Sequence, residues 1–150
     1  MSWLTEKQLL SKIRRNADRD TRAAFFGVTS IDRLPSTIPR YPIILIVNTH
    51  THNLPGEHWI TVFIDKERRG EIFDSLALPV SNMLRRWMNR FTRTWKRNTR
   101  QFQHSLSSSC GAFALYFILH RLHAKNLNDV LSPFKRLSRL NENVVHVFES

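Results

Sequence analysis

The chain has 150 residues, of which 41% are hydrophobic and 11% aromatic, a composition that excludes a disordered tail and suits one globular domain. It carries 23 Lys and Arg against 12 Asp and Glu, so its formal net charge is +11. This excess favours a polyanionic partner, most simply nucleic acid, although a solvated basic surface would have the same composition. A single cysteine excludes an internal disulfide and, with no signal-peptide pattern at the start, predicts an intracellular, reducing compartment.

The first predicted elements are a short helix and an irregular segment. Residues 5–8 (TEKQ) form a capping-box pattern, and Leu9, Leu10 and Ile13 follow at helical spacing. We therefore expect a helix near the start of the chain. The segment 25–42 holds one glycine and three prolines, which predicts an ordered but irregular path across a surface.

Three strands are expected next. The run IILIV at 43–47 is apolar and β-branched, as in a strand that is buried on both faces. After a loop over 49–57 come HWITVFI at 58–64 and EIFDSL at 71–76, separated by the polar turn region 65–70. These segments predict neighbouring strands of one sheet.

A basic amphipathic helix is predicted over residues 81–97, with Ser81 as its cap. Its apolar stripe consists of Leu84, Trp87, Met88, Phe91 and Trp95. The other faces carry the candidate nucleic-acid contacts Arg85, Arg86, Arg90, Arg93, Lys96 and Arg97. A solvated helix face without a partner would show the same pattern.

The last part of the chain is expected to be mainly helical. Residues 100–104 suit a short strand, and the segment from 109 to about 123 is apolar nearly all round, which predicts a central buried helix. A final apolar stripe consists of Leu140, Val144, Val147 and Phe148. The sequence thus predicts a single α+β domain over residues 1–150, with a small, mostly antiparallel sheet packed with helices.

Cys110 lies at the predicted start of the buried helix, in SLSSSCGAFALYFILH (105–120). A thiol attacks as the thiolate, and the unpaired N–H groups and dipole of a helix N-terminus favour negative charge. Gly111 lets another part of the chain approach this point closely. Cys110 is therefore a candidate nucleophile. The alternative is a small core residue, because free cysteines are commonly buried.

His58 is the candidate base, because it opens a strand directly after a glycine-containing loop. His120 and His123 lie at least ten residues along the helix from Cys110, which is about 15 Å at a rise of about 1.5 Å per residue. They are therefore too far away to pair with the thiol.

Asp74 is the candidate acid if strands over 58–64 and 68–74 form a hairpin centred on Lys66. In that register Asp74 lies directly opposite His58 on one face of the sheet, whereas Glu71 points to the other face. A longer turn would shift this pairing.

Acyl transfer also requires donors for the developing oxyanion. The backbone N–H of Cys110 is one candidate, and the side chain of Gln103 or His104 is a second. A glutamine ahead of a loop is, however, commonly just a solvated or backbone-bonding residue.

A metal site is the competing hypothesis for the histidines. His50, His52 and His58 could form a three-histidine site, and His120 and His123 lie about one helical turn apart. No HExxH motif, cysteine pair or acidic cluster supports either site. We therefore expect neither a metal nor a small-molecule cofactor.

The order His, Asp, Gln, Cys, with His-Trp opening a strand and Cys-Gly opening a buried helix, resembles the adenain-like cysteine proteases. More broadly, it resembles the papain-like enzymes that include the SUMO-specific proteases. The matching stretches are IVNTHTHNLPGEHW, EIFDSLALP and QHSLSSSCGAFALYFILH, with FFGVTSIDRLP ahead of them. The resemblance covers most of residues 20–123 and is closest to the short adenain-like proteins of polinton-type elements and related DNA viruses of animals.

The resemblance implies a role for each candidate residue. Cys110 would be the nucleophile, His58 the general base, and Asp74 the orienting acid where the adenovirus enzyme has a glutamate. Gln103, seven residues before the cysteine, would form the oxyanion hole with the N–H of Cys110. Trp59 would pack beside the imidazole, although a plain core aromatic would look the same.

The implied function is a viral endopeptidase that cleaves precursor proteins during particle maturation, next to small residues such as glycine, in the host nucleus and the virion. Double-stranded DNA would be a cofactor. Either an activating peptide binds non-covalently or none is used, because Cys110 is the only cysteine and leaves none for a disulfide. We expect a monomer with no membrane association. The alternatives are a deconjugase of ubiquitin-like proteins with the same fold, and a basic DNA-binding protein in which Cys110 is structural.

Overall fold

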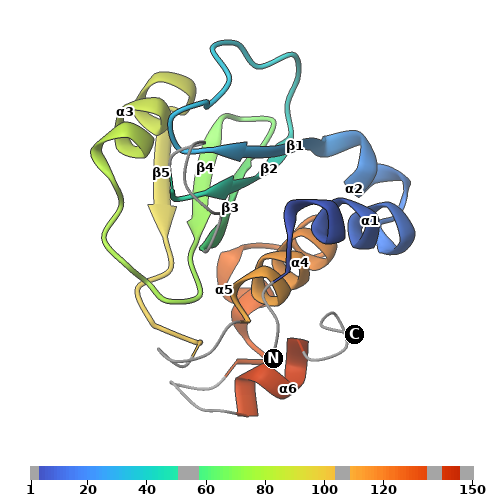
Figure 1. Cartoon of the computed structure of the whole chain (residues 1–150). Helices are drawn as coiled ribbons and strands as arrows, with labels where there is room; N and C mark the ends of the chain where they lie inside the picture. Colours follow the sequence, from blue (N-terminus) through green and yellow to red (C-terminus); the bar gives the residue numbers. More distant parts are fainter. Residues whose placement is uncertain (1–3, 51–57, 104–108, 135–139, 146–150) are drawn as a thin grey trace.

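The computed structural model describes residues 4–50, 58–103, 109–134 and 140–145 (Figure 1). Within these residues, five strands form one sheet in the order β1-β2-β3-β4-β5. The strands are β1 (Phe25–Ser30), β2 (Ile43–Asn48), β3 (Trp59–Ile64), β4 (Arg69–Phe73) and β5 (Thr94–Arg97). The helices are α1 (Glu6–Asn16), α2 (Arg19–Ala24), α3 (Asn82–Phe91), α4 (Cys110–Arg121), α5 (Leu127–Leu131) and α6 (Leu140–Val145). The predicted α+β class is confirmed.

The sheet is mixed. The central strand β3 pairs antiparallel with both β2 and β4. The edge strands β1 and β5 pair in parallel with β2 and β4. The prediction of a mostly antiparallel sheet therefore holds for the centre and is wrong for the two edges.

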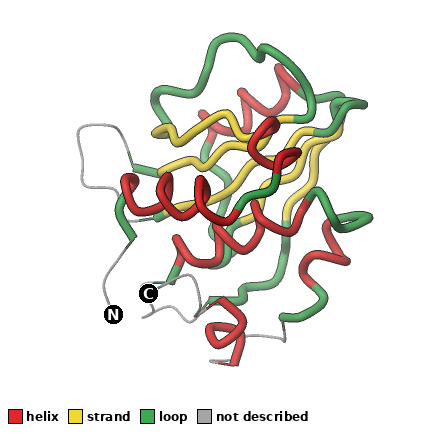
Figure 2. Tube along the Cα trace, turned by 90° about the vertical axis from the view of Figure 1, so that its right-hand side faces the viewer, coloured by secondary structure: helices red, strands yellow, loops and turns green. Residues whose placement is uncertain are grey.

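Helices cover both faces of the sheet, so the fold has two cores. On one face α1 and α4 pack against side chains such as Ile44, Ile46 and Phe63. On the other face α3 packs against Leu45 and Val62 among others. Alternate residues of one strand thus enter opposite cores. This double burial explains why the run at 43–47 is apolar without alternation, as predicted. Figure 2 shows the strands side by side with helices lying across them.

The N-terminal helix begins where its capping box predicts. The Thr5 side chain accepts a hydrogen bond from the Gln8 N–H, and the Gln8 side chain accepts one from the Thr5 N–H. The residue before this box, Leu4, is buried and its carbonyl accepts a 2.9 Å hydrogen bond from the indole of Trp59. The start of the chain is therefore attached to β3 and to the beginning of α4.

The prediction of an irregular path over 25–42 is wrong for its first six residues, which form β1. The strand lies at the edge of the sheet, and its register shifts between Phe25 and Gly27. Because of this bulge and partial burial, the alternation that identifies a strand in a sequence is missing. The prediction holds for the rest of the segment, residues 31–42, which contains the three prolines and no helix or strand.

The predicted helix over 81–97 is wrong in its second half. Ser81 caps α3, as predicted, but the helix ends at Phe91 and the chain then forms β5. At the helix end, both the N–H and the hydroxyl of Thr92 donate to the Met88 carbonyl, at 2.9 and 2.6 Å. Trp95 fitted the helical stripe because it also faces the α3 core, although it does so from a strand.

Gly70 on β4 makes this change of direction possible. A β-carbon at this position would lie 2.7 Å from the end of the Met88 side chain and 2.7 Å from the Thr92 methyl group. It would also lie 3.1 Å from the β-carbon of Trp95. Since no side chain stands there, the end of α3 and the following strand pack directly on β4.

The remaining predictions concern the last third of the chain. The central buried helix is confirmed as α4, which is buried along almost its whole length. The short strand predicted at 100–104 is wrong, because residues 100–103 have no strand pairing; His104 lies outside the described residues. Val144 is part of α6, whereas Val147 and Phe148 lie outside the described residues. Of the helices described, none is both long and apolar enough to cross a membrane.

Candidate active site

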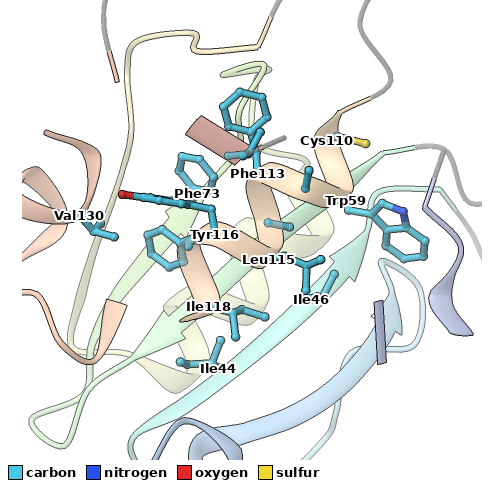
Figure 3. Packing of buried hydrophobic residues seen from close by; sticks show 14 of the residues in the cluster. Ile44, Ile46, Trp59, Phe73, Cys110, Phe113, Leu115, Tyr116, Ile118 and Val130 are labelled. Carbon is cyan, nitrogen blue, oxygen red and sulfur yellow. The ribbon is translucent and has the colours of Figure 1, made fainter. Parts of the chain in front are cut away.

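Cys110 is the first residue of α4 and is only 1% exposed. Figure 3 shows it at the end of a cluster of side chains that extends along α4 through Phe113 and Ile118. Because α4 is held in the core by nearly all its residues, the position of the thiol at its start is well defined. Burial alone would also suit a core cysteine, so the residues around Cys110 must distinguish a nucleophile from a core residue.

His58 and Asp74 lie beside each other at one edge of the central strands. His58 directly precedes β3, and Asp74 directly follows β4. The imidazole Nε2 and the carboxylate Oδ1 are 2.7 Å apart, and both residues are more than nine-tenths buried. A strand end gives each side chain a rigid mount next to a loop.

The register that brings them together differs from the prediction. β3 and β4 pair Thr61 with Phe73, so the hairpin is centred on Glu67 rather than on Lys66. Asp74 therefore falls two residues out of line with His58 instead of directly opposite. A shift of two residues keeps the same face of the sheet, and diagonal side chains on one face remain within reach of each other.

The carboxylate of Asp74 is held by its own turn. Its Oδ1 also accepts a hydrogen bond from the Leu76 N–H at 2.9 Å, and its Oδ2 accepts one from the Leu78 N–H at 3.1 Å. The side chain of Asn98 bonds the Asp74 backbone in both directions. Its Oδ1 accepts from the Asp74 N–H at 2.9 Å, and its Nδ2 donates to the Asp74 carbonyl at 2.7 Å. The acid therefore has little freedom to turn away from His58.

The imidazole of His58 interacts with the thiol of Cys110 as well as with Asp74. Burial lowers the pKa of His58, but the hydrogen bonds to Asp74 and Cys110 and the electrostatic attraction of these two groups outweigh it and raise the pKa to about 9. Because Nε2 faces the carboxylate, Nδ1 is the ring nitrogen left for the thiol. The structure thus connects acid, imidazole and thiol in one chain of contacts.

Gln103 is fully buried and lies against the turn that contains Asp74. Its side-chain Oε1 accepts a 2.6 Å hydrogen bond from the hydroxyl of Ser75. Its backbone N–H donates to the Ser75 carbonyl at 2.9 Å. Of the alternative, a solvated or backbone-bonding glutamine, the solvated form is therefore wrong, whereas the backbone bond is present. His104, the second candidate donor, lies outside the described residues.

Glu71 points to the opposite face of the sheet, as the sequence predicted. Its carboxylate forms a bidentate pair with Arg121 at the far end of α4, at 2.6 and 2.8 Å, and both residues are buried. This pair joins the last turn of α4 to β4. His120 and His123 are exposed at that same end of the helix, away from Cys110, as predicted.

Trp59 belongs to the core on the α4 face. Besides the bond to the Leu4 carbonyl, its ring lies against Gly111, where a β-carbon would be 3.3 Å from the Trp59 Cδ1 atom. The same β-carbon would be 3.0 Å from that of Leu4. Gly111 therefore admits these two side chains to the start of α4, so Trp59 at least serves the core.

The six basic candidates do not form one helical face. Arg85, Arg86 and Arg90 are exposed on α3, and Arg93 is exposed just after it. Lys96 lies on β5, where alternation turns it away from the face that α3 covers. The guanidinium of Arg97 donates to the carbonyls of Leu78 and Asn98, so it braces the turn after Asp74.

Two further features bear on ligands. A small pocket opens beside the His58–Asp74 pair, with apolar walls that include Ile60, Ile72 and Leu84. Within the described part of the chain, no group of three His, Cys, Asp or Glu side chains could hold a metal ion. Of the three histidines of the competing metal hypothesis, His52 lies outside that part.

A buried carboxylate that bonds an imidazole, which in turn bonds a thiol at a helix start, is the arrangement of a cysteine protease. The model of the Ulp1 protease family, C-terminal catalytic domain, matches residues 42–148, a range that spans His58, Asp74, Gln103 and Cys110. The chain belongs to this family and is a cysteine protease domain of the Ulp1 type. The match confirms the broader class named from the sequence and does not distinguish its adenain-like branch.

Two solved structures show how widely this fold occurs. The ASFV pS273R protease is similar with a TM-score of 0.69 at 18% identity, over 93% of this chain and 64% of that one. The central domain of the uncharacterized Lpg1148 protein from Legionella pneumophila is similar with a TM-score of 0.54 at 12% identity, over 98% and 93% of the two chains. At these identities the likeness concerns the fold alone. This chain thus spans less than two-thirds of the ASFV protease, and no curated protein matches it in sequence.

Sequence reasoning missed two residues of the site, Ser75 and Asn98. Ser75 had a weak signal, since it follows the candidate acid directly and small polar residues commonly hydrogen-bond in turns. Asn98 had none, because it follows a strand that the sequence presented as a helix. Its contact with Asp74 spans 24 positions of the chain and exists only in the folded protein.

Proposed function

We propose that the domain is a viral cysteine endopeptidase in which Cys110 is the nucleophile, His58 the general base and acid, and Asp74 the orienting group. The single observation that carries the proposal is the position of His58, which bonds the carboxylate of Asp74 at 2.7 Å and the thiol of Cys110. Family membership supports the reaction class but assigns no residue.

In the proposed reaction His58 holds the proton that it shares with Cys110, and the Cys110 thiolate attacks the peptide carbonyl carbon. The new C–S bond moves an electron pair onto the carbonyl oxygen, where the N–H of Cys110 and the amide of Gln103 would stabilise it. The C–N bond then breaks, and the amine leaves with the proton from His58. Water, deprotonated by His58, then attacks the thioester carbonyl; the C–S bond breaks, the carboxylic acid product leaves, and Cys110 and His58 recover their shared proton.

We propose that the substrates are precursor proteins cleaved next to small residues, notably glycine, during particle maturation in the host nucleus and virion. The proposal draws on the adenain-like motifs around Cys110 and His58. The burial of Cys110, at 1% exposure, supports small residues at the scissile bond, because bulky side chains would need more room beside the thiol.

Cleavage of a panel of peptides with glycine, alanine or leucine at the scissile bond tests this function. We expect turnover of the glycine and alanine peptides that is lost in Cys110→Ala and in His58→Ala. The exposed His123 at the far end of α4 gives a matched control, and His123→Ala should keep full turnover. Turnover that survives Cys110→Ala would contradict the proposal.

We also propose that double-stranded DNA binds the exposed arginines of α3. Arg86 and Arg90 lie one helical turn apart on its exposed side, and Arg85 stacks on the ring of Trp95 with its guanidinium 5.3 Å from the ring centre. Each neutralised phosphate releases counterions, so each charge that binds DNA steepens the salt dependence.

The DNA proposal is tested by binding a duplex oligonucleotide at several salt concentrations. Arg86→Glu and Arg90→Glu should each weaken binding and lower the salt slope by about 1. Lys125→Glu makes the same charge change at an exposed site outside α3 and should have a smaller effect. Equal effects of all three variants would favour a diffuse basic surface over this site.

A deconjugase of ubiquitin-like proteins is the second candidate function, and the Ulp1 family match favours it. The two candidates differ in what they need beyond the scissile bond. A deconjugase should cleave a folded ubiquitin-like protein carrying a fluorogenic C-terminus far faster than the isolated tail peptide, whereas the proposed endopeptidase should not require the folded part.

A further inference from the structure

The two residues that follow β4 hold both halves of the candidate active site. Asp74 bonds the imidazole, and the next residue, Ser75, bonds Gln103. The carbonyl of Ser75 accepts hydrogen bonds from the N–H groups of Phe102 and Gln103, at 2.8 and 2.9 Å. The segment before Cys110 is therefore fastened to this one turn by backbone as well as side-chain bonds.

The hydroxyl of Ser75 determines which way the Gln103 amide points. A primary amide carries its oxygen and its NH₂ group on opposite sides. Because the Ser75 hydroxyl donates to Oε1 at 2.6 Å, the NH₂ group must point away from Ser75. Ser75 is 1% exposed and Gln103 0%, so solvent does not compete for this bond.

We propose that Ser75 is a positioning residue, which orients the amide of Gln103 so that its N–H group faces the oxyanion. This inference rests on the proposed function, in which Gln103 and the Cys110 N–H receive that oxyanion. A donor contributes to catalysis only when it already points at the developing charge. Ser75 therefore affects the stability of the oxyanion through Gln103, while its neighbour Asp74 affects proton transfer through His58.

Two electrophilic reagents that react with the same thiolate distinguish this role of Ser75 from a general effect on the thiolate. With iodoacetamide, the thiolate displaces iodide from a CH₂ group, and no carbonyl oxygen gains charge. With p-nitrophenyl acetate, the thiolate attacks the carbonyl carbon, the oxygen becomes an oxyanion, and p-nitrophenolate leaves. Both reagents are small, so their reaction with the thiolate requires no particular peptide sequence.

In Ser75→Ala we expect the acylation rate to fall at least about tenfold, while the alkylation rate stays within about twofold of the wild type. Gln103→Ala should lose about a hundredfold in acylation, and the double variant should lose no more than Gln103→Ala. Thr92→Val removes another buried hydroxyl, bonded to the Met88 carbonyl at 2.6 Å, and should leave both rates unchanged. Melting temperatures of all variants establish that they fold.

The outcomes distinguish this inference from the proposed function. Full acylation by Ser75→Ala, an equal loss of both rates, or additive losses in the double variant would each overturn the role of Ser75. If Ser75→Ala does not fold, Ser75→Cys keeps nearly the same volume with a weaker donor and allows the same comparison. Acylation that survives Cys110→Ala would instead overturn the proposed function, and this inference with it.

Discussion

Replacement of Asp74 by Asn should remove most of the pH dependence of stability that His58 confers. The pKa of His58 is lowered by burial, but the bonds to Asp74 and Cys110 and their charges raise it from 6.5 to about 9. The folded protein therefore holds this proton more tightly than the unfolded chain. The resulting stabilisation is fully present below the unfolded value of 6.5 and is lost as the pH rises through about 9.

The size of this effect follows from the two pKa values. The pKa rises from 6.5 to about 9, and about 1.4 kcal/mol for each pKa unit gives a stabilisation on the order of 3 kcal/mol. Asn cannot supply the charge of Asp74, so only the contribution of Cys110 should remain. The wild-type free energy of unfolding should thus fall clearly across this pH range, and that of Asp74→Asn much less.

Urea unfolding of both proteins at a series of pH values measures this difference, and an NMR titration of the imidazole reports the pKa directly. Asp18→Asn is a matched control, because Asp18 also contacts a histidine, His123, but both side chains are largely exposed. Asn retains the ability to cap α2, so this variant should change little. Parallel stability curves for the wild type and Asp74→Asn between pH 6.5 and about 9 would refute the reasoning.

Three further predictions concern turnover and packing. Hydrolysis of amides should decline above about pH 9, where His58 loses the proton that the leaving amine needs, whereas hydrolysis of a p-nitrophenyl ester should not; matched declines would contradict this role. Asn98→Ala removes both hydrogen bonds from the Asn98 side chain to the Asp74 backbone, so it should lower the free energy of unfolding in urea by about 1–3 kcal/mol and should lower kcat. An unchanged kcat would mean that these two bonds are only structural. Gly70→Ala places a methyl group 2.7 Å from the side chain of Thr92 and should cost about 1–3 kcal/mol, measurable as a lower Tm; an unchanged Tm would show that the end of α3 yields freely.

The relation between His58 and Asp74 could be anticipated even though the hairpin register was wrong. The prediction centred the turn on Lys66, and the structure centres it on Glu67, which moves each partner by two residues. Side chains on a strand alternate with a period of two, so this error preserves the face. A shift of one residue would have placed Asp74 on the α4 face and separated it from His58.

The change from helix to strand after Phe91 could not be anticipated, because both structures bury Trp95. Trp95 would pack between α3 and the sheet whether it continued the helical stripe or belonged to the edge strand β5. The strand is favoured by a contact far away in the sequence, because Gly70 on β4 leaves room for Met88, Thr92 and Trp95 on the sheet face that α3 covers. This change also redistributed the basic side chains and removed Arg97 from the exposed set.

The sequence by itself determined the features that depend on neighbouring residues. These include the capping box of α1, the doubly buried strand β2, the buried helix α4 and the thiol at its start. Periodicity and capping are local, so they can be recognised without the rest of the molecule.

Only the tertiary structure decided which side chains meet. His58, Asn98 and Gln103 all form hydrogen bonds with the turn at Asp74 and Ser75, across separations of 16 to 28 positions in the chain. Hydrogen-bond partners that far apart leave no periodic trace in the sequence, because their approach depends on strand register and on the close packing that Gly70 and Gly111 permit. The types of residue needed for the chemistry are therefore visible in the sequence, whereas their orientation is a property of the folded chain.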